Sequence, residues 1–372
     1  MSNTFITIKI RIVFLVCFFS LLKMNAGNPY ISSGKLGKEM ITWDNSLLLP
    51  PSGDKVNPGI AGAFSGFIGD NLIIAGGANF PDKAPWDGGD KKWWNTLYSL
   101  NVTSENARWE IKQNLLPDAL AYGVSIQLPD GMLCIGGCNS VKCSAGVFLL
   151  YEKNGQIEVS TDWPSLPVPL ANATGALLNN KVYIAGGQES MEKQEATLHF
   201  YVLDLANRDK GWRTLPAWPG KPRGYAVSAV QCNGTDNCFY LFSGRDYNAD
   251  GYIEVLTDGF VYNPRINAWH KLTGRFPVMA GTAMAIQDDS ILFFGGVPRL
   301  VPGSDKHPGF DNTVRIYHTM KDSLSEVETA PYPIAVTTNI ARKNNVFYIA
   351  SGEIKPGIRT PYILKGKMQM QD

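Results

Sequence analysis

A pattern of apolar and polar positions recurs six times along the chain. Each copy consists of a polar turn, four or five apolar residues, and then a small residue followed by glycine. The apolar runs, such as residues 72–75 and 182–185, are typical of strands that are buried on both faces. The copies end at Gly76-Gly77, Gly136-Gly137, Gly186-Gly187, Ser243-Gly244, Gly295-Gly296 and Ser351-Gly352.

The spacing of these copies predicts the fold class. Successive copies are 60, 50, 57, 52 and 56 residues apart. The turns before the apolar runs consist of Asn, Asp and Gly, which favour the backbone conformations of tight hairpins. A period near 50 residues with a double glycine resembles the kelch repeat, in which each repeat forms one four-stranded blade. We therefore predict an all-β fold, a six-bladed kelch-type β-propeller.

The last blade is short of a strand, because the chain ends soon after Tyr362. Residues 41–43 supply the missing outer strand in this interpretation, since Trp43 and the following Leu-Pro repeat a phrase found at Trp212. Joining the two ends of the chain within one blade closes the ring and removes free sheet edges. The prediction is one propeller over residues 27–372.

The N-terminus has the pattern of an export signal. Lys9 and Arg11 precede an apolar run over residues 12–22, which is shorter than the roughly 20 residues that span a bilayer. Small residues at 25–27 predict cleavage after Ala26, so residues 1–26 are expected to be a signal peptide. The mature protein is then periplasmic or secreted and leaves the membrane after cleavage.

The net charge argues against nucleic acid as a partner, and the cysteines suggest two disulfides if the protein is exported. The net charge is +1, which gives no basic surplus for binding nucleic acid. Five cysteines follow the signal peptide, and two pairs are close enough in sequence for disulfides in an oxidising compartment, Cys138 with Cys143 and Cys232 with Cys238. Cys134 is expected to be a buried thiol. The alternative is that all five are reduced. No pattern in the chain sets the oligomeric state.

Candidate functional residues fall on one face of the predicted ring. The segments that follow the double glycines and the segments that enter the inner strands share that face, at the opening of the central channel. Arg223 and Arg245 belong to one blade, and arginines at an opening can hold a carboxylate in a bidentate manner. Residues 352–360, GEIKPGIRT, place Glu353 and Arg359 on either side of a Pro-Gly turn. A carboxylate facing a channel can act as a general base. The alternative for this pair is a loop salt bridge of little energetic consequence.

The GEIKPGIRT run resembles the G-E-x-K-P-G-x-R-T motif of the N-acetylneuraminate epimerases, the sialic acid mutarotases. Residues 62–66 with 72–78, and residues 121–125 with 134–137, also resemble that family. The resemblance implies a six-bladed propeller exported to the periplasm. In the family these two stretches follow the motif, whereas here they precede it, so we expect a circularly permuted chain.

The resemblance also implies a reaction and its residues. The reaction interconverts the α and β anomers of N-acetylneuraminic acid by opening and reclosing the sugar ring, with no cofactor and no metal. Glu353 corresponds to the proton acceptor and Arg359 to its partner. Arg223 or Arg245 is expected to join Arg359 in holding the substrate carboxylate. Weaker candidates for hydroxyl or N-acetyl contacts are Tyr122, Asn79 and Gln188.

Three alternatives compete with this interpretation. The main one is a non-catalytic kelch propeller that binds a glycan or a protein partner. A copper radical oxidase would need histidine and tyrosine ligands at the axis, and the four histidines lie in outer-strand or loop contexts. A glycoside hydrolase would need two carboxylates about 5–10 Å apart. Asp246, Asp250 and Glu254 share one loop, but no feature of the sequence directs them to the axis.

Overall fold

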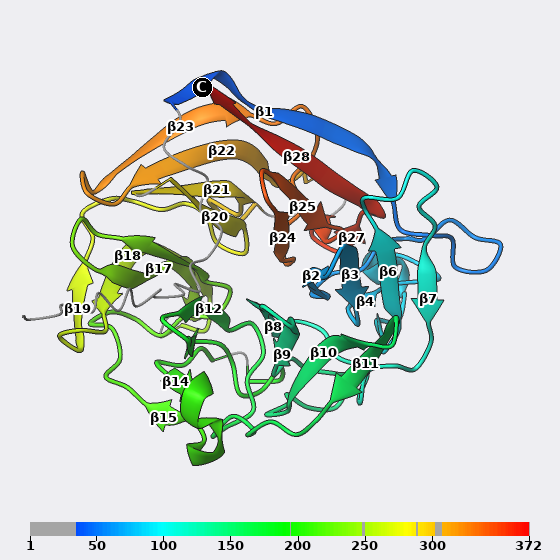
Figure 1. The fold of residues 1–372 in the computed structure, drawn as a ribbon, viewed down its shortest axis with the longest axis horizontal. Helices are drawn as coiled ribbons and strands as arrows, with labels where there is room; N and C mark the ends of the chain where they lie inside the picture. The colour runs from blue at the N-terminus through cyan, green and yellow to red at the C-terminus, as the bar shows by residue number, and fades with distance from the viewer. Residues whose placement is uncertain (1–34, 194, 248–249, 288, 302–306, 372) are drawn as a thin grey trace, which may run out of the picture.

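The computed structural model describes residues 35–193, 195–247, 250–287, 289–301 and 307–371. These residues form six four-stranded antiparallel sheets arranged as blades in a ring (Figure 1). Within the described ranges the helical segments are two short 3-10 helices, Pro85–Asp87 and Leu205–Lys210. The all-β fold and the six-bladed propeller are confirmed, whereas the kelch character of the repeat stays a prediction. The predicted signal peptide lies outside the described residues.

Each blade is a meander of four strands. Blade 1 contains β2 (Phe64–Ile68), β3 (Asn71–Ala75), β6 (Leu97–Asn101) and β7 (Glu110–Lys112); blade 2 contains β8 (Val124–Leu128), β9 (Gly131–Ile135), β10 (Val147–Lys153) and β11 (Gln156–Ser160); blade 3 contains β12 (Thr174–Leu178), β13 (Lys181–Ala185), β14 (Phe200–Asp204) and β15 (Arg213–Thr214). Blade 4 contains β16 (Val227–Cys232), β17 (Asn237–Tyr247), β18 (Ile253–Asn263) and β19 (Ala268–Lys271); blade 5 contains β20 (Thr282–Ile286), β21 (Ser290–Gly296), β22 (Asp311–His318) and β23 (Ser323–Thr329).

Blade 6 contains β24 (Ile340–Lys343), β25 (Val346–Ala350), β28 (Tyr362–Gln371) and β1 (Lys35–Leu48), in that order from the axis outward. The N-terminal strand β1 thus pairs with the C-terminal strand β28 (Figure 1). In this pairing Trp43 stands opposite Gly366. The Trp43 indole packs edge-on against Phe294 and Phe347. Its Nε1 donates a hydrogen bond of 2.7 Å to Glu328. The predicted closure of the ring by the N-terminal strand is confirmed.

The double glycines connect neighbouring blades. Gly76 has a φ of +69°, and a Cβ there would lie 2.4 Å from the carbonyl oxygen of Leu120 at the entry of blade 2. Gly77 donates a 2.8 Å hydrogen bond to that same carbonyl. Glycine is therefore required both by the left-handed backbone and by the close approach of the next blade. Gly137 and Gly187 donate the equivalent hydrogen bonds to the carbonyls of Leu170 and Arg223. This shared contact explains why the double glycine recurs in these blades.

A closed circle of six backbone hydrogen bonds surrounds the axis where the inner strands begin. We call its members the collar: Gly62, Tyr122, Asn172, Tyr225, Ala280 and Thr337. Each member donates its N–H to the carbonyl of a member in the neighbouring blade, over 2.7–2.9 Å. All six have a positive φ, between 51° and 67°. Because left-handed backbone is costly for residues other than glycine, this circle is held by the closure of the whole ring.

The cysteines depart from the expected disulfides. The structure records Cys134, Cys138, Cys143, Cys232 and Cys238 as free thiols. Cys138 and Cys143 do stand opposite each other in an antiparallel bridge. Cys232, however, pairs with Asn237 while Cys238 pairs with Gln231. Successive side chains of a strand point to opposite faces, so Cys232 and Cys238 lie on different faces of the sheet. The alternative of five reduced cysteines fits the structure.

Candidate functional site

The loops that were expected to share one face do meet there. Each segment entering an inner strand forms a backbone bridge with the residue that follows its own double glycine. The bridges are Ala61 with Ala78, Ala121 with Cys138, Ala171 with Gln188, Gly224 with Arg245, and Val336 with Glu353. Blade 5 makes the equivalent bond from Val297 to Met279. These bridges lie beside the collar, which places the candidate residues around one opening.

Glu353 and Arg359 face each other across a small hairpin of β26 (Glu353–Lys355) and β27 (Ile358–Arg359). Gly357 makes the turn with a φ of +78°, and its backbone lies against Pro85 and Trp86. These two residues belong to the loop between the short strands β4 (Ala78–Asn79) and β5 (Lys92–Trp93). On the other side, Phe310 donates its N–H to the carbonyl of Ile354 over 3.0 Å. The hairpin is thus held between loops of blades 1 and 5.

The two side chains form an ion pair, with Glu353 Oε1 2.8 Å from Arg359 Nη2. The Glu353 side chain is 18% exposed and that of Arg359 only 4%. The second carboxylate oxygen of Glu353 accepts a long hydrogen bond of 3.4 Å from the hydroxyl of Thr337, a collar residue. The Arg359 guanidinium lies 4.7 Å from the centre of the Phe80 ring. Its Nε and Nη1 are buried and make no hydrogen bond of good geometry among the described residues, and the Tyr122 hydroxyl is near enough to interact with the guanidinium.

Two collar tyrosines belong to the same electrostatic environment. Burial raises the pKa of the Tyr122 phenol, the negative charge of Glu353 raises it further, and Arg359 partly offsets both. Burial likewise raises the pKa of Tyr225, with Arg245 acting in the opposite direction. Both phenols therefore stay protonated in neutral solution and can donate hydrogen bonds. Tyr122 was predicted as a site residue and Tyr225 was missed. The available signal was its position, because Tyr225 follows Gly224 at the entry of blade 4 as Tyr122 follows Ala121 at the entry of blade 2.

Arg245 lies at the opening, as predicted. The guanidinium is 4.1 Å from the centre of the Tyr225 ring, and its Nε is buried without an acceptor in the described part of the chain. We use the name mouth for the group formed by Tyr122, Tyr225, Arg245, Glu353 and Arg359.

Lys91 adds a further cation that the sequence interpretation missed. Its Nζ lies 4.5 Å from the centre of the Tyr122 ring and 5.1 Å from that of Trp93, and the side chain is half-buried. Burial and the nearby Arg359 lower the pKa of Lys91 to about 8, against the opposing charges of Glu353 and Cys138. The available signal was the Lys-Lys-Trp-Trp run at residues 91–94.

Arg223 does not reach the opening. Its side chain is 0% exposed, donates to the carbonyl of Ser243 over 2.9 Å, and lies 3.0 Å from Asp258 Oδ1. The guanidinium also packs 5.0 Å from the centre of the Phe260 ring. A side chain with no exposed surface cannot contact a ligand, so the structure assigns Arg223 to the scaffold of blade 4 rather than to the carboxylate site that we expected.

Asn79 and Gln188 lie next to the mouth but serve the fold. Asn79 is 3% exposed and uses both ends of its amide, donating to Gly59 O over 2.8 Å and accepting from Trp94 Nε1 over 2.9 Å. Gln188 is 2% exposed and accepts a 2.8 Å hydrogen bond from the collar residue Asn172. Both amides position backbone around the opening, which is a different role from the substrate contacts that we predicted.

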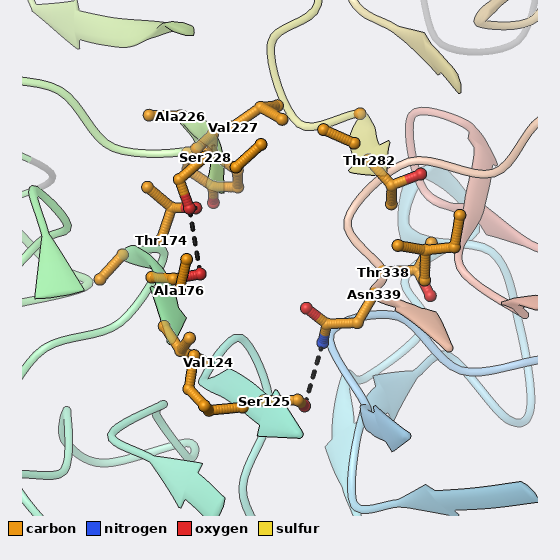
Figure 2. Close-up of a pocket in the computed structure, with 18 of the residues that line it drawn as sticks. Val124, Ser125, Thr174, Ala176, Ala226, Val227, Ser228, Thr282, Thr338 and Asn339 are labelled. Carbon is orange, nitrogen blue, oxygen red and sulfur yellow. Dashed lines mark hydrogen bonds between the residues drawn. The ribbon is translucent and has the colours of Figure 1, made fainter. Parts of the chain in front are cut away.

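A cavity of about 340 Å³ fills the channel between the inner strands. Figure 2 shows Ser125, Thr174, Ser228, Thr338 and Asn339 around its open centre, with Asn339 bonded to Ser125 over 3.3 Å. None of the residues lining it carries a carboxylate, amine, guanidinium or imidazole. The charged candidate residues therefore lie at the mouth, and the phenols of Tyr122 and Tyr225 line the cavity as well.

Two further observations apply to the described residues. No group of three His, Cys, Asp or Glu side chains there is arranged to hold a metal ion. No helix within the same ranges is both long and apolar enough to span a membrane.

Comparison with known proteins agrees with this architecture. The model of the N-acetylneuraminate epimerase family matches residues 22–159 and 163–301. The N-acetylneuraminate epimerases of Escherichia coli K12 and Shigella flexneri are both 29% identical to the chain over 229 residues, 54% of this chain and 59% of theirs. The chain thus spans about three fifths of the length of these curated relatives. The Glu353 hairpin lies outside the matched segments, and the circular permutation stays a prediction. Because the family model covers well over half of the sequence, the chain belongs to the N-acetylneuraminate epimerase family.

Proposed function

We propose that this protein is a mutarotase that interconverts the α and β anomers of N-acetylneuraminate. The observation that carries the proposal is the Glu353–Arg359 pair, held at 2.8 Å beside two protonated phenols at the opening of the channel. The names of the family and of its curated members support the substrate. The predicted signal peptide extends the proposal to a periplasmic or secreted enzyme.

Opening a cyclic hemiketal requires one proton to leave and another to arrive. In the proposed mechanism the Glu353 carboxylate takes the proton of the anomeric hydroxyl, the bond between the anomeric carbon and the ring oxygen breaks, and the ring oxygen is protonated. The open-chain ketone then rotates, and the same steps in reverse close the ring on its other face. No atom or electron is gained or lost overall.

Charge at the mouth favours an anionic sugar. Lys91, Arg245 and Arg359 bring three cations to a site in which Glu353 is the carboxylate paired with Arg359. The Nε and Nη1 of Arg359 and the Nε of Arg245 make no hydrogen bond within the described residues, and in this proposal they donate to a substrate carboxylate when the side chains turn toward the opening. Guanidinium donors in a partly water-excluded site hold such a group more strongly than they would in water.

Proton NMR tests the proposal directly. Freshly released N-acetylneuraminate is rich in one anomer, and the approach to equilibrium is followed with the protein, with Glu353→Gln, with Glu152→Gln as an exposed carboxylate control, and with buffer alone. We expect acceleration by the wild type and by Glu152→Gln, and loss of about 10²-fold or more in Glu353→Gln. Equal rates for wild type and buffer would leave a binding propeller without turnover as the surviving alternative.

A further inference from the structure

Lys91 brings an amine to the edge of the mouth, and the mechanism above gives this amine no part in the proton transfers. Lys91 ends the β4–β5 loop, and its Nζ lies against the ring faces of Tyr122 and Trp93. Among the described residues no carboxylate lies within 4 Å of this amine. The neighbouring Glu353 and Arg359, in contrast, form an ion pair with each other. The adjacent Lys92 is exposed and packs on Trp94, so the two lysines of the pair have different surroundings.

We propose that Lys91 is a second catalytic residue, the general acid that protonates the ring oxygen while Glu353 acts as the base. This inference rests on the proposed mutarotase function and deepens it. It follows from the position of the amine on the collar residue Tyr122, in the same charged cluster as Glu353 and Arg359.

Two separate groups balance the protons of the reaction. Glu353 receives the proton of the anomeric hydroxyl as the C–O bond to the ring oxygen breaks, and the Lys91 ammonium gives its proton to that oxygen. The open-chain ketone is then flanked by a carboxylic acid and a neutral amine. On reclosure the amine takes a proton from the attacking hydroxyl, and the carboxylic acid protonates the carbonyl oxygen. Glu353 and Lys91 thus return to their starting protonation states. No proton has to move from the anomeric hydroxyl to the ring oxygen through a single residue.

The groups around Lys91 suit this role. Burial and Arg359 of β27 disfavour the charged amine, while Glu353 of β26 and the Cys138 thiol that follows β9 favour it, and the resulting pKa is about 8. Tyr122 contributes the face of its ring. A general acid works best when its pKa is near the working pH, and lysines are tuned for such tasks by burial and by neighbouring cations.

The test compares two replacements of Lys91 with matched changes at Lys92. Lys91→Arg keeps the positive charge and the packing on Tyr122 but cannot release a proton, whereas Lys91→Met removes the charge at similar length. The anomerisation assay gives kcat and KM for each, and circular dichroism gives the melting temperature. We expect both Lys91 variants to lose about 10²-fold in kcat with little change in KM, while Lys92→Arg and Lys92→Met keep the wild-type values.

The pH profile provides a readout that needs no variant. After subtraction of the buffer rate, kcat of the wild type should fall above about pH 8, as the acid loses its proton. A wild-type kcat that is level to pH 9.5, or full kcat in folded Lys91→Arg, overturns the assignment. Full kcat in Lys91→Arg with a raised KM in Lys91→Met identifies Lys91 as a carboxylate anchor only. If Glu353→Gln is inactive in the same series, the mutarotase proposal stands even when the Lys91 assignment fails.

Discussion

Glu353 and Arg359 stand directly opposite each other on a two-stranded hairpin, with 2.8 Å between Oε1 and Nη2. Within the described part of the chain, Arg359 Nε and Nη1 have no acceptor, although the side chain is almost fully buried. Buried guanidinium donors without acceptors are costly. The scaffold residue Arg223 also has an Nε and an Nη2 without a hydrogen bond among the described residues, so what distinguishes Arg359 is its place beside Glu353, whose second oxygen contacts the collar residue Thr337. We propose that a substrate carboxylate binds there.

Replacing Arg359 by methionine is therefore expected to impair the reaction at two points. The carboxylate loses its donors and Glu353 loses its partner, so kcat/KM should fall by about 10²-fold, equivalent to about 3 kcal/mol. Because the two residues act as a unit, combining Arg359→Met with Glu353→Gln should cost little more than Glu353→Gln alone. Additive losses in the anomerisation assay would show that the two side chains act independently.

Arg223 illustrates a different use of arginine. Replacement by methionine leaves Asp258 without its cation and Ser243 O without a donor. We expect the free energy of unfolding in urea to fall by about 3 kcal/mol. This value is at the lower end of the cost of breaking a buried ion pair, because the Asp258 side chain is 29% exposed. KM for the sugar should be unchanged in the folded fraction. A raised KM with normal stability would return Arg223 to the binding site.

The recurring pattern predicted the six blades and their closure because both depend on local chemistry. In blades 1 to 3 a Cβ on the first glycine would lie 2.2–2.4 Å from a carbonyl oxygen of the next blade, so glycine is needed there. Ser243 and Ser351 take the same position in blades 4 and 6 with a φ of +57°. The terminal strand was predictable because an unfinished blade leaves an edge that only the other end of the chain can cover.

The side-chain directions were not predictable in the same way. Arg223 enters its inner strand at the expected place, since its carbonyl accepts from Gly187, yet its guanidinium turns into the blade. The position of Arg223 in the sequence was enough to place its backbone, but it did not determine which rotamer the side chain adopts. Lys91 was missed because its partners Tyr122 and Arg359 are far away in sequence and meet it only when the ring closes.

The collar offers a test of the closed ring. Gly62 has a φ of +67°, and a Cβ there would lie 2.5 Å from the backbone nitrogen of Tyr122. Gly62→Ala therefore has to displace the backbone or the ring of Tyr122, which donates its N–H to Gly62 O. We expect a loss of about 2–3 kcal/mol in the free energy of unfolding, from backbone strain and steric overlap together. Gly53→Ala is the matched control, because Gly53 has a similar φ of +62° but no atom within 4 Å of its added Cβ. A loss equal to that control would show that the collar does not constrain this position.

The thiols make a prediction about strand register. Cys232 and Cys238 point to opposite faces of blade 4, so iodoacetamide in denaturant without reductant should label both. Mass spectrometry of the tryptic peptides reads the result. A non-reduced peptide in which these two cysteines are cross-linked would show that the register of β16 and β17 differs from the one described here.

The burial of Lys91 also predicts how stability varies with pH. Its pKa is about 8 in the folded protein against 10.5 for an unperturbed lysine, so between these values the unfolded chain holds more protons. Stability must then rise with pH in that window. The buried phenols act in the opposite direction only above about pH 10, where unfolded tyrosines ionise. Between pH 7.5 and 9.5 the free energy of unfolding of the wild type should gain about 1–2 kcal/mol relative to Lys91→Met. Measuring both proteins cancels the titration of the shared cysteines. Parallel curves would mean that the amine is as well solvated in the folded protein as in the unfolded chain.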